Sequence, residues 1–473
     1  MRRPVAVLIG CAALVLCGCV VGPNYHGAPA VLGTAPTFTR ATPESLSTQP
    51  AARWWTGLAD PELDHLIELA LAANPDKQAA EARVREARAV LRQQHANDLP
   101  TTGLSGALLH TRNFSTLVGS SGSGESGSLN LYALGFDASW EIDLFGAHAR
   151  AIEGAAAALS GSQASLADLL VSLTAEVAQA YVQLRDAQQR LALTERDAAI
   201  EAQVIALMRV RRAGGTATDL DVARVENQLD TTRATLGPLR AAVIEQLDRL
   251  ALLSAQAPGA LDRELAPTRA VPAPPEKVAI GDPASLLRRR PDIAIAERKL
   301  AQQTAAVGEN VAALFPKVTL LGDVGFAATS SQQLFNGSNF TYILAPILQW
   351  SPFDFGRTRS RIAQASAARD EAEAQYRGAV LTALEDAETA LANYGQQRIT
   401  VQDLARAQAS AEQVYHLTEI RLRGGTADTT DVLDADTRRV HAELSYQQAL
   451  AQLTEDFVAL QKSLGLGWVP AQH

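Results

Sequence analysis

The chain has 473 residues, of which 47% are hydrophobic, 20% are charged and 5% are aromatic. This length ordinarily corresponds to about three domains. The 42 Lys and Arg residues against 51 Asp and Glu residues give a net charge of −9, which excludes a chain-wide basic surface for nucleic acid. All three cysteines precede residue 20, so the rest of the chain can form neither a disulfide framework nor a cysteine-based zinc site. The eight histidines are scattered without metal-ligand spacing, and we expect no metal site.

Residues 1–18 form a predicted export signal. Two arginines precede an apolar stretch that ends in small residues, which is typical of a signal peptide. Residues 16–19, with the sequence LCGC, resemble the lipobox of bacterial lipoproteins. This resemblance implies a covalent lipid on Cys19, and we expect no other cofactor. The alternative is an uncleaved membrane helix over residues 5–21, because that stretch approaches the ~20 apolar residues that span a bilayer.

The sequence contains one unit twice. Matched motifs lie 216 or 210 residues apart: Asn74-Pro75-Asp76 with Arg290-Pro291-Asp292, and Gly214-Gly215-Thr216 with Gly424-Gly425-Thr426. The first unit covers residues 19–256 and the second covers residues 284–473. The prolines of residues 257–283 predict an extended linker between them.

Each unit opens with a helix and later contains a very long one. Residues 147–213 and 357–423 are each 67 residues without a proline, or roughly 100 Å if helical throughout. Apolar side chains recur every seven residues in the first of these stretches, which is coiled-coil spacing: Ile152, Leu159, Leu166 and Leu173. Alanine at many positions in between permits close packing on two sides, as the wall of a tube requires. A simple two-helix coiled coil is the alternative.

Each long helix is followed by a Gly-Gly turn and a returning helical segment. The returning segments cover residues 216–256 and 426–464. Proline inside a helix removes one hydrogen bond and clashes with the preceding turn. Pro238 therefore predicts two shorter helices in the first returning segment.

Residues 101–145 and 317–355 are predicted β-hairpins. Within residues 129–145 the even positions are apolar and most odd positions are polar, which is the period of a strand with one apolar face. Strands of this length with aromatic residues on the apolar face fit a membrane β-barrel, and a soluble sheet is the alternative. Four strands cannot close a barrel with an interior, and lipid does not tolerate an open edge. Several chains would therefore share one barrel.

The chain resembles the TolC-like outer membrane factors, in particular the lipoprotein branch of OprM and NodT type. The resemblance rests on the doubled unit and on three motifs: Gly22-Pro23-Asn24-Tyr25, Trp54-Trp55, and GGTADTTDVLDA at residues 424–435. It implies a mixed fold, in which a long coiled-coil helical barrel continues from a twelve-stranded β-barrel. The β-barrel would be formed by a homotrimer with four strands per chain.

The resemblance also implies a function. Family members are outer-membrane exit ducts of tripartite efflux systems that extend into the periplasm, and type I protein secretion is the alternative role. The implied partners are a periplasmic adaptor, an inner-membrane transporter of the RND type and outer-membrane lipid, without nucleic acid. The cargo stays open, because the transporter selects it.

The resemblance places two kinds of site in this chain. The helical tips would dock the adaptor, through Gly214, Gly215, Thr216, Gly424, Gly425 and Thr426. Asp431 and Asp434 match the paired aspartates of a periplasmic gate. The tyrosine and arginine that hold TolC shut are replaced by Leu422 and Ala427, so that closing contact is not expected here.

An enzyme and a soluble scaffold are the competing classes. Residues 122–127 match a dinucleotide-binding glycine pattern, but they lie in a Gly/Ser loop that precedes a strand, and that motif needs a helix there. Neither a phosphate-binding loop nor a hydrolase nucleophile motif occurs, so we expect no enzymatic activity. A periplasmic coiled-coil scaffold or adaptor would share the long helices, but not the alternating hairpins.

Overall fold

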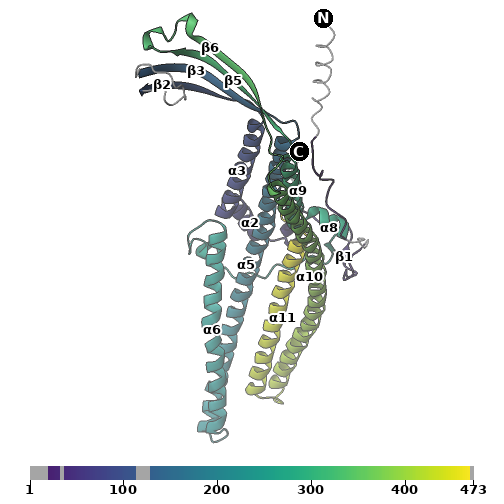
Figure 1. The fold of residues 1–473 in the computed structure, drawn as a ribbon. Coiled ribbons are helices and arrows are strands. Elements are labelled where there is room, and N and C mark those ends of the chain that lie inside the picture. Colours follow the sequence, from purple (N-terminus) through teal and green to yellow (C-terminus); the bar gives the residue numbers. More distant parts are fainter. Residues whose placement is uncertain (1–19, 32–36, 113–127, 469–473) are drawn as a thin grey trace. The chain divides into compact units, whose positions relative to one another are not determined.

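The computed structural model describes residues 20–31, 37–112 and 128–468 (Figure 1). Cys19 and the glycine pattern at residues 122–127 lie outside the described residues. The chain divides into two compact units. The first comprises residues 1–29, 83–162 and 295–376, and the second comprises residues 30–82, 163–294 and 377–473.

The first unit contains a four-stranded antiparallel sheet in the order β2-β3-β5-β6. Its strands are β2 (Thr101–Arg112), β3 (Ser128–Ile142), β5 (Lys317–Ala328) and β6 (Phe340–Gln349). The register pairs Leu104 with Phe136, Phe136 with Val324, and Val324 with Tyr342. Even-numbered residues of all four strands therefore occupy one face, because side chains alternate along a strand.

The even-numbered face of the sheet is apolar and exposed in the single chain. Its exposed members include Leu104, Leu108, Phe136, Val324, Tyr342, Leu344 and Leu348. Water would not favour so large an apolar surface, whereas lipid would. Pro346 lies in β6, which is an edge strand, and edge strands tolerate proline because one side of the strand needs no partner within the chain.

The described residues form six long helices: α3 (Pro75–Asn97), α5 (Ala147–Ala213), α6 (Asp219–Leu253), α9 (Pro291–Ala312), α10 (Arg357–Arg423) and α11 (Thr429–Ser463). Helices α5 and α10 coincide with the two proline-free stretches, and each ends at a Gly-Gly pair. Two shorter helices, α2 (Pro61–Ala73) and α8 (Pro283–Arg289), start with a proline after a capping aspartate, Asp60 or Asp282.

The remaining elements are short: β1 (Ser45–Leu46), η1 (Trp54–Leu58), α7 (Asp262–Leu265), β4 (Val278–Ala279), η2 (Ser331–Gln333) and η3 (Gly337–Asn339). Strands β1 and β4 pair in parallel. The linker segment at 257–283 is held rather than free, because the buried Arg185 and Gln188 on α5 donate hydrogen bonds to its carbonyl group at Leu265.

The expected break at Pro238 is wrong, because α6 continues through this proline. Part of the clash of proline with the preceding residue involves that residue's Cβ, and Gly237 has none. The carbonyl of Ala234, which loses its helical partner, lies in an exposed residue and is accessible to water.

The repeated motifs perform the same task in each half of the second unit. Asn74 donates a hydrogen bond from Nδ2 to the carbonyl of Leu253, the last residue of α6, at 3.0 Å. Arg290 donates from Nη1 to the carbonyl of Ser463, the last residue of α11, also at 3.0 Å. Carbonyl groups at a helix end lack a partner within the helix, so each motif satisfies one of them.

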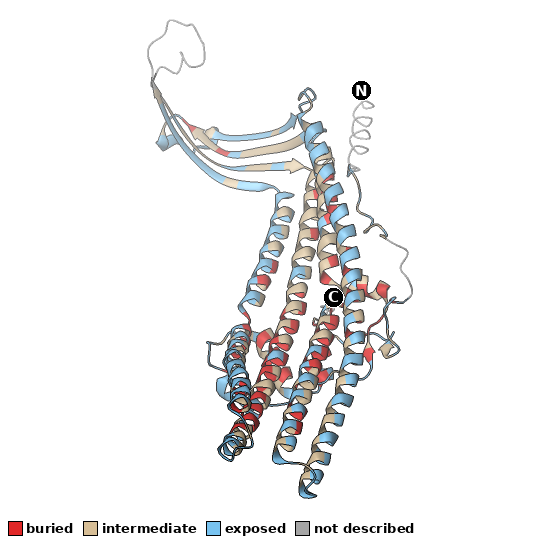
Figure 2. Ribbon diagram, turned by 90° about the horizontal axis from the view of Figure 1, so that it is seen from below, coloured by how far each residue is buried: buried red, intermediate tan, exposed pale blue. Residues whose placement is uncertain are grey.

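The core of the second unit is mainly aliphatic, and it also contains buried charged side chains such as Arg185. Side chains that are fully buried include Leu63, Leu66, Ile67, Leu184, Leu250, Leu286, Leu391 and Leu460. Arg185 on α5 is 0% exposed and forms an ion pair with Glu62 on α2. Figure 2 shows the buried residues of α5 and α10 near the middle of each helix, whereas those of α11 lie mostly in its C-terminal half. The turns after α5 and α10 are exposed.

Candidate functional sites

The turn after each long helix has a Schellman geometry. In the first turn Gly215 has φ +75°, and the amides of Gly215 and Thr216 donate hydrogen bonds to the carbonyls of Arg212 and Arg211 at 3.0 and 2.9 Å. In the second turn Gly425 has φ +71°, and the equivalent two bonds measure 3.0 and 2.9 Å. A positive φ favours glycine, so the backbone conformation by itself explains why positions 215 and 425 are glycine. Gly214 and Gly424 are not among the glycines with positive φ, so backbone conformation does not require glycine at these two positions.

Each returning helix begins with a capping box. Thr218 caps α6, and its partner is Asp221; Asp428 caps α11, and its partner is Asp431. Asp428 accepts the Asp431 amide on Oδ1 at 3.0 Å, and its Oδ2 accepts a hydrogen bond from Arg211 Nη2 at 2.5 Å. The hydrogen bond from Arg211 lowers the pKa of the Asp428 carboxyl.

The Arg211–Asp428 ion pair joins the two turns within one chain, and the sequence did not reveal it. Threonine occupies the matching cap position in the first repeat, Thr218, and its single hydroxyl oxygen is already used by Asp221. Aspartate offers a second oxygen. The difference between Thr218 and Asp428 in otherwise repeated turns was the signal that could have indicated this contact.

The structure gives each of the two predicted gate aspartates, Asp431 and Asp434, a partner within the chain. The Asp431 carboxylate accepts the Asp428 amide at 2.9 Å as part of the capping box. Asp434 accepts from Arg438, one helical turn further on, at 2.7 Å, and the Asp434 side chain is 60% exposed. Their spacing of three residues places the two carboxylates on one face of α11.

A third site holds the N-terminal segment in the first unit. Arg150 on α5 is 3% exposed and donates hydrogen bonds to the carbonyls of Val21 and Gly22 and to the Asn24 side chain, at 3.2, 3.3 and 2.6 Å. A Cβ on Gly22 would lie 2.5 Å from Gly308 Cα. The Gly-Pro-Asn motif is thus bonded to Arg150 and packed closely against Gly308. The part of Arg150 was not apparent from the sequence.

The next residue of this motif is also held. The Tyr25 hydroxyl donates a hydrogen bond to Glu297 on α9 at 3.0 Å. Burial, and next the Glu297 charge, raise the pKa of the Tyr25 hydroxyl, so it keeps its proton and remains a donor. The segment that follows residue 19 is therefore fastened to the first unit at three successive points: the Val21 and Gly22 carbonyls, Asn24 and Tyr25.

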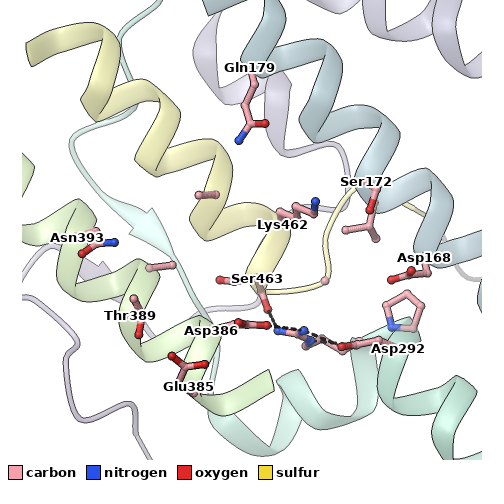
Figure 3. A pocket seen from close by; sticks show the side chains of 16 residues that line it. Asp168, Ser172, Gln179, Asp292, Glu385, Asp386, Thr389, Asn393, Lys462 and Ser463 are labelled. Carbon is pink, nitrogen blue, oxygen red and sulfur yellow. Dashed lines mark hydrogen bonds and ion pairs between the residues drawn. The ribbon is translucent and has the colours of Figure 1, made fainter. Parts of the chain in front are cut away.

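A polar pocket of about 390 Å³ in the second unit surrounds the repeated Arg290 motif (Figure 3). Arg290 donates to Asp292 and Asp386 at 2.7 and 3.0 Å. Burial lowers the pKa of Arg290, but hydrogen bonds from this guanidinium to Asp292 and Asp386 outweigh burial and raise it. Burial also raises the pKa of Asp168, and the Asp292 charge adds to this rise. These contacts hold the end of α11, and they assemble no nucleophile with a base.

These features define a class of protein: a membrane channel component with an exposed apolar β-sheet and long helices that end in exposed turns. The model of the outer membrane efflux protein family matches the chain twice, over residues 66–256 and 283–466. The protein belongs to this family. It is an outer-membrane efflux duct and not an enzyme.

Three similar proteins illustrate the match. Nodulation protein T of Rhizobium leguminosarum bv. trifolii is 29% identical over 97% of this chain and 96% of its own. The pyoverdine export outer membrane protein OpmQ of Pseudomonas aeruginosa is 32% identical over 98% of this chain and 97% of its own. The solved structure of the outer-membrane channel OprN has a TM-score of 0.87 and 34% identity, over 94% of this chain and 99% of its own. The expected mixed fold and the resemblance to the OprM and NodT type are confirmed.

Proposed function

We propose that the protein is the homotrimeric outer-membrane duct of a tripartite efflux system. A periplasmic adaptor and an inner-membrane transporter of the RND type would deliver substrate to it, and the duct would carry substrate to the outside. The observation that carries this proposal is the four-stranded sheet, whose apolar face is exposed and whose outer strands β2 and β6 have no further partner among the described residues. Three such sheets would close one barrel of twelve strands.

Chemical crosslinking of the purified protein in detergent tests the assembly. We expect covalent trimers as the largest product, together with cation-conducting channels after reconstitution in planar bilayers. Crosslinking that stops at the monomer would contradict the proposal. A protein that stays soluble and monodisperse without detergent after removal of its lipid would instead favour a periplasmic scaffold.

The lipid on Cys19 is part of the proposal. Arg150 and Tyr25 hold the chain directly after this residue, so an acyl anchor at residue 19 would lie beside a fixed segment of the first unit. Mass spectrometry of the mature protein should show an acylated N-terminal Cys19. An intact N-terminal methionine or a free thiol would contradict this part of the proposal.

The gate is proposed at Asp431 and Asp434. In a homotrimer the two carboxylates of each chain would be repeated around the threefold axis. Crowded carboxylates attract cations, as rings of acidic side chains do in cation channels. The Arg211–Asp428 pair would tie the two turns of each chain together beside this ring.

Replacing both gate aspartates by asparagine should remove block of the closed duct by trivalent cations added from the periplasmic side, and should reduce cation selectivity. Asparagine at 431 keeps an oxygen that can accept the Asp428 amide in the capping box, and asparagine at both positions removes the charge. Asp221→Asn is the matched control, because it makes the same change in the capping box of the first repeat and leaves Asp431 and Asp434 intact. Single-channel recording in planar bilayers measures both properties. If the double variant kept the selectivity and block of the wild type, the gate would have to lie elsewhere.

A further inference from the structure

A second pocket in the second unit, of about 590 Å³, is basic. It lies beside α8, and its lining includes Ser47, Asp282, Ser285, Arg288, Arg289 and Trp468. Arg288 is exposed and Arg289 is half-buried. The neighbouring Arg290 is not a lining residue of this pocket, because it turns toward Asp292 and Asp386.

The two arginines of this pocket have no ion-pair partner in the part of the chain that the structure describes. No described residue forms an ion pair with Arg288 or Arg289. The Arg289 Nη1 atom and the Trp468 Nε1 atom are both buried without a hydrogen-bond partner among described residues. Buried donors are usually paired, so two unpaired donors on residues that line one pocket call for an acceptor.

Asp282 is the one acidic residue in the lining, and it is engaged elsewhere. Its Oδ1 accepts the Ser285 amide at 2.8 Å, which caps α8. Burial lowers the pKa of Arg289; the Asp282 charge opposes this effect and the Arg288 charge adds to it. A half-buried guanidinium next to a second one is stabilised when an anion binds between them.

The repeated unit shows that the fold does not require these arginines. At the offset of 216 residues that aligns Asn74 with Arg290, Arg288 and Arg289 correspond to Ala72 and Ala73. Asn74 and Arg290 both bind the end of a returning helix. The two alanines close α2 in the first repeat, so the two arginines are an addition that the helix itself does not need.

We propose that Arg288 and Arg289, with the Trp468 indole N–H, form a binding site for a small oxyanion, the carboxylate or phosphate group of a ligand. The planar fork of arginine matches both groups, because each presents two oxygens to parallel N–H donors. The Asp282 carboxylate in the lining disfavours a larger, more highly charged anion. This site is separate from the turns and from the gate.

The test uses the full-length protein in detergent, with inorganic phosphate and N-acetylglycine as probes at constant ionic strength. Line widths in ³¹P and ¹H NMR spectra report binding of each probe. We expect at least about twofold broadening of one or both probes with the wild type, and loss of this broadening in the double variant Arg288→Ala with Arg289→Ala. That variant restores the residues of the first repeat, so it should fold.

Arg233→Ala, which removes an exposed arginine of α6, is the matched control and should keep the broadening. Broadening by phosphate alone assigns a phosphate ligand, and broadening by N-acetylglycine alone assigns a carboxylate. If both probes broaden and displace one another, the site accepts either group. Equal broadening in the wild type and in the double alanine variant, or none in the wild type, would overturn the proposal.

Discussion

Gly214→Trp is expected to abolish export while the protein still assembles as a trimer. An added Cβ at Gly214 would meet only the carbonyls of Arg211 and Val210, at 3.6 and 3.7 Å, which is ordinary contact. The turn can therefore keep its geometry while a large side chain covers the proposed docking surface. Loss of an adaptor contact worth more than about 1.4 kcal/mol lowers binding at least tenfold. Two quantities are measured: the susceptibility of cells that express the complete pump to a toxic substrate of that pump, and the yield of trimer.

Two companion variants separate docking from folding. Gly214→Ala adds a small group at the same position and should leave export unchanged. Gly215→Trp places a side chain at φ +75°, a conformation that costs a residue with a Cβ roughly 1–2 kcal/mol, so it should weaken the turn itself. Loss of the trimer in Gly214→Trp would show that the turn has a structural role. Normal export by this variant would show that the turn has no part in docking.

Arg185→Ala is expected to lower the free energy of unfolding of the second unit by about 3–5 kcal/mol, because it leaves the buried carboxylate of Glu62 without its main partner. Arg185 is fully buried and donates further bonds to Gln188 and to the carbonyl of Pro267, at 2.7 and 2.9 Å. Its guanidinium also lies 4.9 Å from the ring centroid of Tyr181, a cation–π distance. Urea unfolding of the solubilised protein, followed by helical circular dichroism, measures the change.

Arg249→Ala is the matched control for this prediction. Arg249 and Glu176 also pair across two helices, at 2.5 Å, but their side chains are 46% and 40% exposed. Removal of such a surface pair should cost less than about 1 kcal/mol. The combined variant Arg185→Met with Glu62→Leu should recover most of the lost stability, since a buried pair and a well-packed apolar pair are often equivalent. If Arg185→Ala and Arg249→Ala lowered the free energy of unfolding equally, burial of the Arg185–Glu62 pair would have no effect on its contribution to stability.

Local sequence patterns determined the elements and their order. The proline-free stretches at 147–213 and 357–423 are the two longest helices, because nothing in them interrupts the helical hydrogen bonds. Alternation over residues 129–145 indicated β3, because side-chain period and backbone conformation are directly linked. The Gly-Gly turns were also apparent, since glycine is favoured where φ is positive.

Only the tertiary structure decided which charged residues lie inside and what they contact. In the sequence, three arginines look like ordinary residues of a helix. In the structure, Arg150 holds the N-terminal segment, Arg185 is buried in the second unit, and Arg211 joins the two turns. Pro238 likewise predicts a break that its exposed position and the preceding Gly237 make unnecessary. A sequence pattern along one helix predicts the conformation of that helix only. The free-energy cost of burying a charge depends instead on its partners, which here lie more than a hundred residues away in the sequence.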